Sequence, residues 1–231
     1  MLRLLKTHYP KYVALYESFE ENIYKANFMR FFIMHRYGGV YADLDFECLR
    51  PLDNWTVNNE CIMSENHHVH SYFVARRETA EVMITFLAAQ PNHFYFRLAI
   101  EMLSLYKNMD YGEKLLYADM VYRIYLAGKL NDMPGYGVTV THPDYFLPAY
   151  DKEVSRSIHG SCEFEIPVIS DRKKIEETCN GLKDGTEGQK PKAFSYGNHH
   201  WAHTILWKKR KLIPSKIPIV EVVPTYQVPR I

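Results

Sequence analysis

The sequence predicts an α/β domain, and three observations lead to that fold class. Helix-like and strand-like patterns alternate along the 231 residues, which is typical of a sheet covered by helices. One buried helical pattern runs into Gly38-Gly39 and then into an apolar strand, which gives a helix–turn–strand unit. The chain is also long enough to bury one large core, so we expect a single main domain.

The first elements are predicted to be mostly helical. The segment LRLLKTHYP resembles the end of a helix that Pro10 breaks, and YVALYESF fits either a short strand or a helical turn. From Asn22 to Tyr37, apolar residues recur at helical spacing and also fill the opposite side. This pattern predicts a largely buried helix that Gly38-Gly39 stops. A strand over Val40–Phe46 is expected next, and then a turn that contains Pro51.

The rest of the chain mixes short strands with helices. CIMSEN and HSYFVARR predict strands, whereas RETAEVMITFLAAQ predicts an amphipathic helix that ends at Pro91. FYFRLAIEMLSLYKN and YADMVYRIYLAGK predict two further helices, and GVTVTHPDYFLPAY predicts strand, turn and strand. Residues 170–192 are polar and Gly-rich, so we expect a mobile loop there. Order is expected to return with AFSYGNHHWAHTILWKK, and the Pro-rich residues 211–231 are expected to form a surface tail after a domain that spans residues 1–210.

Composition limits the function classes. The net charge of +1 gives no electrostatic reason to expect nucleic acid or an anionic membrane as a partner. Hydrophobic residues make up 47% and charged residues 24%, which is ordinary for a soluble globular protein, and most of the 14% aromatic residues are expected in the core. No apolar run reaches the ~18 residues of a membrane span, and the start lacks the apolar core of a signal peptide. The sequence as given is therefore expected to be soluble. The alternative that it is an excised piece of an anchored protein stays open.

The four cysteines argue against a zinc site. Cys48, Cys61, Cys162 and Cys179 form no CxxC pair. Their even number allows two disulfides without requiring any.

The predicted strand Val40–Phe46 carries two aspartates, Asp43 and Asp45, separated by one residue. Alternate side chains of a strand share a face, so both carboxylates are expected on the same side, about 7 Å apart at Cα. A buried carboxylate is costly unless it is paired or binds a metal, and Mg²⁺ and Mn²⁺ prefer carboxylate oxygens and substrate phosphates. A surface turn with two solvated aspartates is the alternative for a bare Asp-x-Asp match.

The surroundings of the pair favour a ligand. The glycines deliver both aspartates to the carboxyl end of a strand, which is the edge where open α/β sheets bind ligands. Arg30, on the preceding buried helix, can contact phosphate or sugar oxygens.

The stretch KANFMRFFIMHRYGGVYADLDFECLRPLD resembles the DXD region of the family-32 glycosyltransferases. The resemblance is specific over residues 22–53, weaker through NHFYFRLAIEML, and returns at HHWAHT near residue 200. It implies a GT-A-like domain with a Rossmann-type mixed sheet flanked by helices. It also implies Mn²⁺ (or Mg²⁺) as cofactor and the transfer, with retention, of a hexose such as mannose. The implied partners are a GDP- or UDP-hexose donor and a glycan or glycolipid acceptor.

The resemblance also assigns roles to residues. Asp45 would coordinate the metal, Asp43 would hold ribose or donor sugar, and the two form the implied catalytic pair. The implied donor-binding residues are Asn27, Arg30, Gly39, Tyr41 and Asp43. The late motif matches His199, His200, Trp201 and Thr204. Imidazole can complete the coordination of Mn²⁺, which predicts His199 and His200 as metal ligands, although a His pair can also be structural or merely exposed.

Several features depart from the family pattern. Asn27 stands where the family usually has Asp, and Ile205 replaces a final Trp. LLYADM (residues 115–120) stands in place of a Thr-Gly-Pro segment, and Asp119 within it is the residue that could compensate. The sequence also starts after the point where the family has its first strand, so we expect that strand to be lacking and activity to be attenuated.

Other functions stay open. One is a catalytically silent sugar- or nucleotide-binding relative that acts as a partner subunit. Another is a metal-dependent phosphohydrolase, which would need a further acidic ligand such as Glu47. The family resemblance places the protein in the Golgi lumen, in a membrane-anchored full-length form or with a partner subunit.

Overall fold

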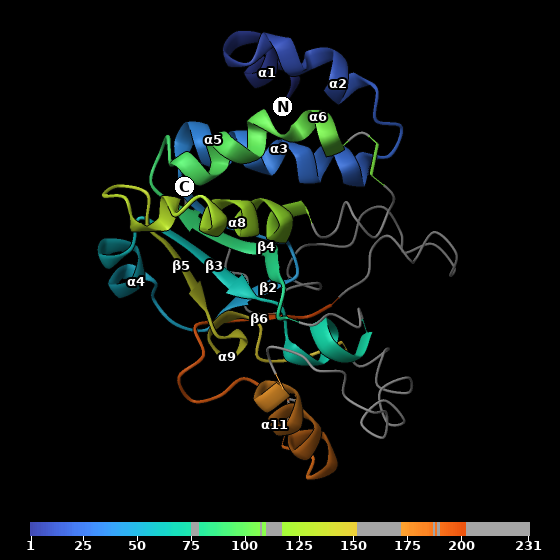
Figure 1. Cartoon of the computed structure of the whole chain (residues 1–231), viewed down its shortest axis with the longest axis vertical. Coiled ribbons are helices and arrows are strands. Elements are labelled where there is room, and N and C mark those ends of the chain that lie inside the picture. The colour runs from blue at the N-terminus through green and yellow to red at the C-terminus, as the bar shows by residue number, and fades with distance from the viewer. Residues whose placement is uncertain are drawn as a thin grey trace, which may run out of the picture. The chain divides into compact units, whose positions relative to one another are not determined.

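The computed structural model describes residues 1–74, 79–106, 108–109, 117–151, 172–186, 188 and 190–201. The chain divides into two compact units, each taken by itself below. The first unit comprises residues 1–41, 53–63 and 82–140, and the second comprises residues 42–52, 64–81 and 141–231. Both mix helices with strands (Figure 1). The predicted α/β class is therefore confirmed, whereas the Rossmann-type detail stays a prediction.

The first unit consists of helices and a four-stranded sheet. The sheet has the order β1-β4-β3-β5. Its strands, which lie mainly in this unit, are β1 (Gly39–Ala42), β3 (Cys61–Glu65), β4 (Val82–Ala89) and β5 (Val138–Thr141). The helices among its described residues are α1 (Leu2–His8), η1 (Pro10–Tyr12), α2 (Val13–Glu17), α3 (Asn22–Tyr37), α4 (Asp53–Asn58), α5 (Phe94–Glu101), α6 (Leu103–Tyr106), α8 (Tyr117–Ala127) and η3 (Leu130–Asp132). Helix α3 packs against α5, α5 against α8, and α8 against β4. Many of the aromatic side chains lie in the core between these elements, as predicted.

Helix α3 has the predicted bounds because its sequence stops it sharply. Gly38 has φ 60° and ψ −147°, a conformation that essentially only glycine adopts, and its N–H donates to the Met34 carbonyl. A Cβ on Gly38 would lie 2.6 Å from the Ala89 carbonyl oxygen and from the Pro91 nitrogen. The turn that starts β1 therefore depends on glycine twice, once for its dihedral angles and once for space.

The described residues of the second unit form a two-stranded sheet and three helical segments. Strands β2 (Phe46–Cys48) and β6 (Gly197–His199) are antiparallel, with Phe46 opposite His199. The helical segments are the π-helix η2 (Val69–Val74), α9 (Pro143–Phe146) and α11 (Arg172–Lys183). A Cβ on Gly197 would collide with the Phe46 ring, so a larger residue at that position would require the ring to move.

The prediction of one continuous strand over Val40–Phe46 was wrong. The chain forms β1, then a turn at residues 43–45, then β2. The Phe46 N–H donates to the Asp43 carbonyl over 3.0 Å, and Leu44 is 79% exposed at the tip of the turn. Asp is favoured at the first position of such a turn, and this local preference outweighs the apolar rhythm that suggested one continuous strand. The argument that Asp43 and Asp45 share a strand face was therefore also wrong.

Four other element predictions also failed. The segment predicted as an amphipathic helix before Pro91 contains β4, whose apolar run is buried on both faces and so shows no strand alternation. HSYFVARR contains η2 instead of a strand, and the predicted second strand after β5 contains α9. The predicted loop at 170–192 contains α11, where Ile175, Thr178 and Cys179 form a narrow buried stripe among charged residues.

Two further expectations can be compared with the described residues. Cys48 and Cys61 are free thiols, which excludes two disulfides. None of the helices in the described ranges has both the length and the apolar character that crossing a membrane requires. The predicted tail at 211–231 lies outside the described residues, as do Thr204 and Ile205.

Candidate metal centre

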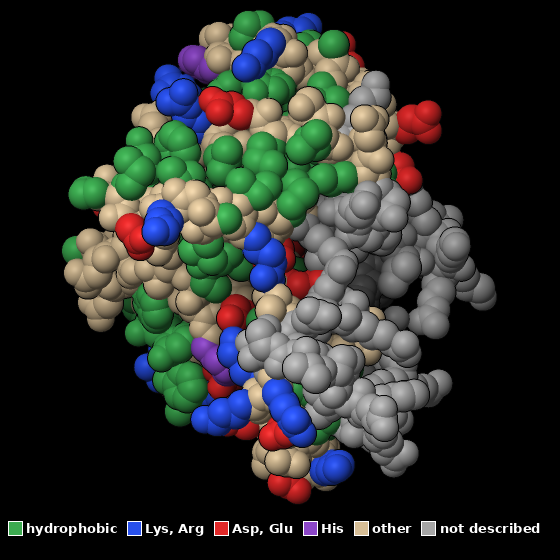
Figure 2. All heavy atoms as spheres, in the orientation of Figure 1, with side chains coloured by type: hydrophobic (Ala, Val, Ile, Leu, Met, Phe, Trp, Pro, Cys, Tyr) green, Lys and Arg blue, Asp and Glu red, His purple; other side chains and the backbone are tan. Residues whose placement is uncertain are grey.

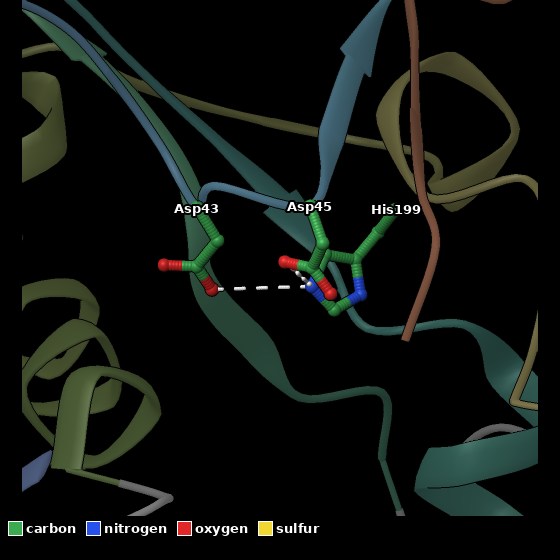
Figure 3. A group of neighbouring side chains, drawn as sticks. All are labelled: Asp43, Asp45 and His199. Atoms are coloured by element: carbon green, nitrogen blue, oxygen red, sulfur yellow. Dashed lines mark ion pairs between the residues drawn. The ribbon is translucent and has the colours of Figure 1, made fainter. Parts of the chain in front are cut away.

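Asp43, Asp45 and His199 converge in the second unit. Figure 3 shows the two carboxylates and the imidazole facing one another, the aspartates from the turn between β1 and β2 and the histidine from β6. The His199 Nε2 atom lies 3.1 Å from Asp45 Oδ1 and 4.0 Å from Asp43 Oδ2. One ligand atom from each residue lies within 4.8 Å of the other two. The turn thus brings the carboxylates together in a way that the strand argument did not anticipate.

The pairing of β2 with β6 places the histidine. Phe46 is opposite His199 in the register, and the backbone N–H of His200 donates to the Asp45 carbonyl over 2.9 Å. The last residue of the turn is therefore fixed to the strand that carries His199. Since these contacts are made by the backbone, the arrangement of the three side chains follows from strand pairing.

The spacing of the three side chains fits a small divalent ion. Mg²⁺ and Mn²⁺ bind oxygen ligands at about 2.1 Å in octahedral geometry, so adjacent ligands lie about 3.0 Å apart and opposite ligands about 4.2 Å apart. The distances of 3.1 Å and 4.0 Å from His199 to the two carboxylates lie close to these values. The Asp45 side chain is 16% exposed and that of Asp43 is 24% exposed, so a ligand can reach both from solvent. Their binding of a metal stays a prediction.

His200 does not join this group. His200 follows the last residue of β6, and its Nε2 atom lies 3.1 Å from Glu47 Oε2. Among the described residues, the group that could hold a metal contains neither His200 nor Glu47.

Trp201 packs against His199 and is itself stacked on His70, and no role was predicted from the sequence for either residue. The indole of Trp201 meets the His199 ring edge-on, with 4.5 Å between centroids, and stacks on His70 at 4.2 Å. Its Nε1–H donates to the Ala149 carbonyl over 2.7 Å. Trp201 has a positive φ of 53°, which is uncommon for a bulky residue and marks a site that its surroundings must hold in place. Trp201 could have been found from the HHW motif, whereas no signal in the sequence singles out His70.

The predicted donor-binding residues of the first unit form a second cluster. The Arg30 guanidinium is buried and donates to the Asn27 amide oxygen over 2.9 Å and to the Ile84 carbonyl over 2.8 Å. It also lies over the Tyr41 ring, 4.6 Å from the centroid. Gly39, with φ 87°, precedes these contacts on β1. The structure therefore brings Arg30, Asn27 and Tyr41 together, and their contact with a donor stays a prediction.

Asp119 has a structural role. Its Oδ1 atom accepts the Val82 N–H over 3.0 Å at the start of β4, and its Oδ2 atom lies 2.6 Å from Arg123 Nε. Residues 115 and 116 of the same segment lie outside the described ranges. Compensation by Asp119 for the altered segment stays a prediction.

Comparison with known proteins tests the resemblance to glycosyltransferases that contain a DXD motif. Residues 1–62 match the family described as "Glycosyltransferase sugar-binding region containing DXD motif". The predicted DXD resemblance is confirmed. The matched stretch contains Asp43 and Asp45, whereas His199 lies outside it. No solved structure is significantly similar to the chain.

The relatives of this DXD stretch include several mannosyltransferases. "Inositol phosphoceramide mannosyltransferase 3" of Schizosaccharomyces pombe is 43% identical over 53 residues, which is 23% of this chain and 15% of that protein. "Initiation-specific alpha-1,6-mannosyltransferase" of Candida albicans is 33% identical over 67 residues, 29% of this chain and 17% of that protein. A "Mannosyl phosphorylinositol ceramide synthase" of Saccharomyces cerevisiae is 43% identical over 49 residues, 21% of this chain and 13% of that protein. The chain thus covers less than a fifth of each of these relatives.

Proposed function

We propose that this chain is a metal-dependent glycosyltransferase that moves a hexose from a nucleotide-sugar donor to a glycan or glycolipid acceptor. The observation that carries the proposal is the convergence of Asp43, Asp45 and His199, in a chain whose DXD stretch matches a glycosyltransferase family. Mannose is the expected sugar because several relatives are named as mannosyltransferases. A glycolipid acceptor is supported by the words inositol phosphoceramide in one of those names. A Golgi location and a membrane-anchored full-length form are part of the same proposal and rest on the family resemblance.

The residues of the site have distinct proposed roles. Asp45 and His199 hold Mn²⁺ or Mg²⁺, and Asp43 orients the ribose or the sugar of the donor. A bound divalent ion would stabilise the negative charge that grows on the departing nucleoside diphosphate. Asp43 and Asp45 carry the charge that attracts that ion, and the Trp201 contact keeps the His199 ring in one orientation. Retention of the anomeric configuration is expected from the family resemblance.

Donor turnover tests the proposal. The chain should release nucleoside diphosphate from a GDP- or UDP-hexose in the presence of Mn²⁺, and EDTA should stop the release. Asp43→Asn should abolish it, whereas Glu47→Gln, which changes a nearby acid outside the three-residue group, should not. Release that continues unchanged in Asp43→Asn or in EDTA would contradict the proposal.

A silent partner subunit is the second candidate, and the Arg30 cluster is the observation that favours it. With asparagine at position 27, the Arg30 guanidinium faces a neutral amide, so the cluster lacks the negative charge that the family usually has there. Under this reading the chain binds donor without turnover, and Asn27→Asp should raise the rate of donor cleavage. A phosphohydrolase is less favoured, because its required acid, Glu47, is already paired with His200.

A further inference from the structure

The first unit contains a cavity of about 430 Å³ that the proposed transfer reaction does not use. Its walls come from the N-terminal helical segments, the end of α3, the turn before α5 and the second half of α5, and all of its lining residues belong to the first unit. The polar ones include Tyr9, Lys11, His35, Asn92 and Arg97. His35 lies three residues before Gly38, at the starting end of β1, whereas the DXD turn follows the other end of that strand. The cavity is therefore separate from the candidate metal centre along the chain.

The lining offers hydrogen-bond donors that the protein leaves available. The Tyr9 hydroxyl bonds to His35 Nδ1 over 2.7 Å, which leaves the Nε2 atom of the same ring for another partner. Asn92 is fixed by its backbone N–H, which donates to the His35 carbonyl over 2.7 Å, and it has a positive φ of 62°. Within the described ranges, the side chains of Lys11 and Asn92 make no hydrogen bond or ion pair. The Lys11 ammonium lies over the Tyr12 ring, 4.9 Å from its centroid.

The cavity has a positive character. Burial lowers the pKa of His35, and the positive charges of Arg97 and Arg36 lower it further. Glu101 is the acidic residue of the lining, and its carboxylate is already paired with Arg97 over 3.1 Å. Figure 2 shows several Lys and Arg side chains over and beside α1, with an Asp or Glu side chain among them. The local field therefore favours an anion over a cation.

We propose that this cavity binds a sugar phosphate. The phosphate meets Lys11 and Arg97, which supply charge-assisted hydrogen bonds, while Asn92 and His35 Nε2 bond to hydroxyl groups of the ring. The volume is several times what a phosphate alone needs, and the rings of Tyr9 and Tyr12 give the sugar an apolar surface to pack on. The same chemistry can come from a free sugar phosphate or from the headgroup of a lipid. The proposal does not depend on glycosyl transfer.

Calorimetry on the whole chain, without divalent metal, tests the site. Mannose 6-phosphate should bind more tightly than inorganic phosphate, and neutral mannose should bind least. Lys11→Gln and Arg97→Gln should each weaken mannose 6-phosphate binding roughly tenfold or more, because each removes a charge-assisted hydrogen bond. The matched control is Lys25→Gln, since Lys25 is a lysine of the same unit that also lies over a tyrosine ring but is not part of the cavity lining. Asp45→Asn should bind mannose 6-phosphate like the unchanged chain, which separates this site from the donor site.

Vesicles distinguish the two sources of the ligand. Sedimentation with phosphatidylcholine vesicles that contain phosphatidylinositol, reversed by mannose 6-phosphate, would support a lipid headgroup. Binding of mannose 6-phosphate without sedimentation would support a free sugar phosphate. The proposal is overturned if neither binds, if Lys25→Gln weakens binding as much as Lys11→Gln, or if Asp45→Asn abolishes it.

Discussion

Asp45→Asn is the sharpest test of the candidate metal centre, read as a thermal shift with Mn²⁺. In the unchanged chain, Mn²⁺ at about 100 times its dissociation constant should stabilise the folded state by about 2.7 kcal/mol. For a chain of this length, 1 kcal/mol corresponds to roughly 2–4 °C in Tm, so the expected increase is roughly 5–10 °C. Asp45→Asn should remove most of that increase, because an amide oxygen is a weaker ligand and one of the two negative charges is lost.

The metal-free chain should respond in a different way. The ligand oxygens of Asp43 and Asp45 lie within 4.8 Å of each other, and two unit charges 4.8 Å apart repel by about 3.5 kcal/mol at an effective dielectric constant of 20. Partial exposure of both side chains reduces this repulsion. Asp45→Asn relieves it but also weakens the 3.1 Å contact with His199. The two effects oppose each other, so the metal-free Tm should change little.

Differential scanning fluorimetry with and without Mn²⁺ measures both effects, and Glu47→Gln is the matched control. Glu47 is a neighbouring acid on β2 whose carboxylate lies beside His200 instead of in the three-residue group. Its substitution should leave the Mn²⁺-induced increase intact. The reasoning is refuted if Asp45→Asn keeps the full increase, or if Glu47→Gln loses as much of it.

Three further predictions concern the turn, the support of His199 and the response to acid. Gly38→Ala should lower the free energy of unfolding by more than 3 kcal/mol, because it adds a steric clash to backbone strain. Gly39→Ala, with no atom near its Cβ, should lower it by only about 1–2 kcal/mol. Equal losses of the two variants in urea unfolding would contradict this prediction. Trp201→Phe removes the hydrogen bond to the Ala149 carbonyl and should weaken Mn²⁺ binding roughly tenfold in a calorimetric titration, and unchanged affinity would show that the indole does not position His199. Burial and the nearby His70 lower the pKa of His67 far below its usual value, so the unfolded chain takes up a proton that the folded chain does not. The contribution of His67 to the free energy of unfolding is therefore lost as the pH falls through about 6.5, by about 1.4 kcal/mol between about pH 7.5 and about pH 5.5. His67→Gln should remove this loss, which urea unfolding at the two pH values measures.

Elements with strong local signals were predicted from the sequence. Helix α3 was predicted with its bounds, since its long apolar pattern and its stop at Gly38 are both local features. Strand β4 was mistaken for a helix because a strand buried on both faces has no alternation to recognise. Helix α11 was missed because most of its residues are charged, and its ion pairs at i,i+4, such as Arg172 with Glu176, cannot be told from a solvated loop by composition.

The candidate site was predicted better than the element that carries it. The prediction of Asp43 and Asp45 as neighbours survived the error about the strand, because two residues that flank the tip of a tight turn also come close in space. His199 is 154 positions from Asp45, and no local rule of sequence links them. Only the order of the DXD and HHW motifs suggested that they meet.

The choice between His199 and His200 could not be made from the motif, which contains both. Strand pairing makes that choice, since the register places His199 opposite Phe46 and the backbone N–H of His200 is bonded to the Asp45 carbonyl. A one-residue slip of β6 would exchange them, bringing His200 to the carboxylates and moving His199 away. Such a slip would put Asn198 in the place of Gly197, where a Cβ collides with the Phe46 ring, so the slip would also require that ring to move. The histidine that joins the two aspartates is therefore set by the register of β6 against β2.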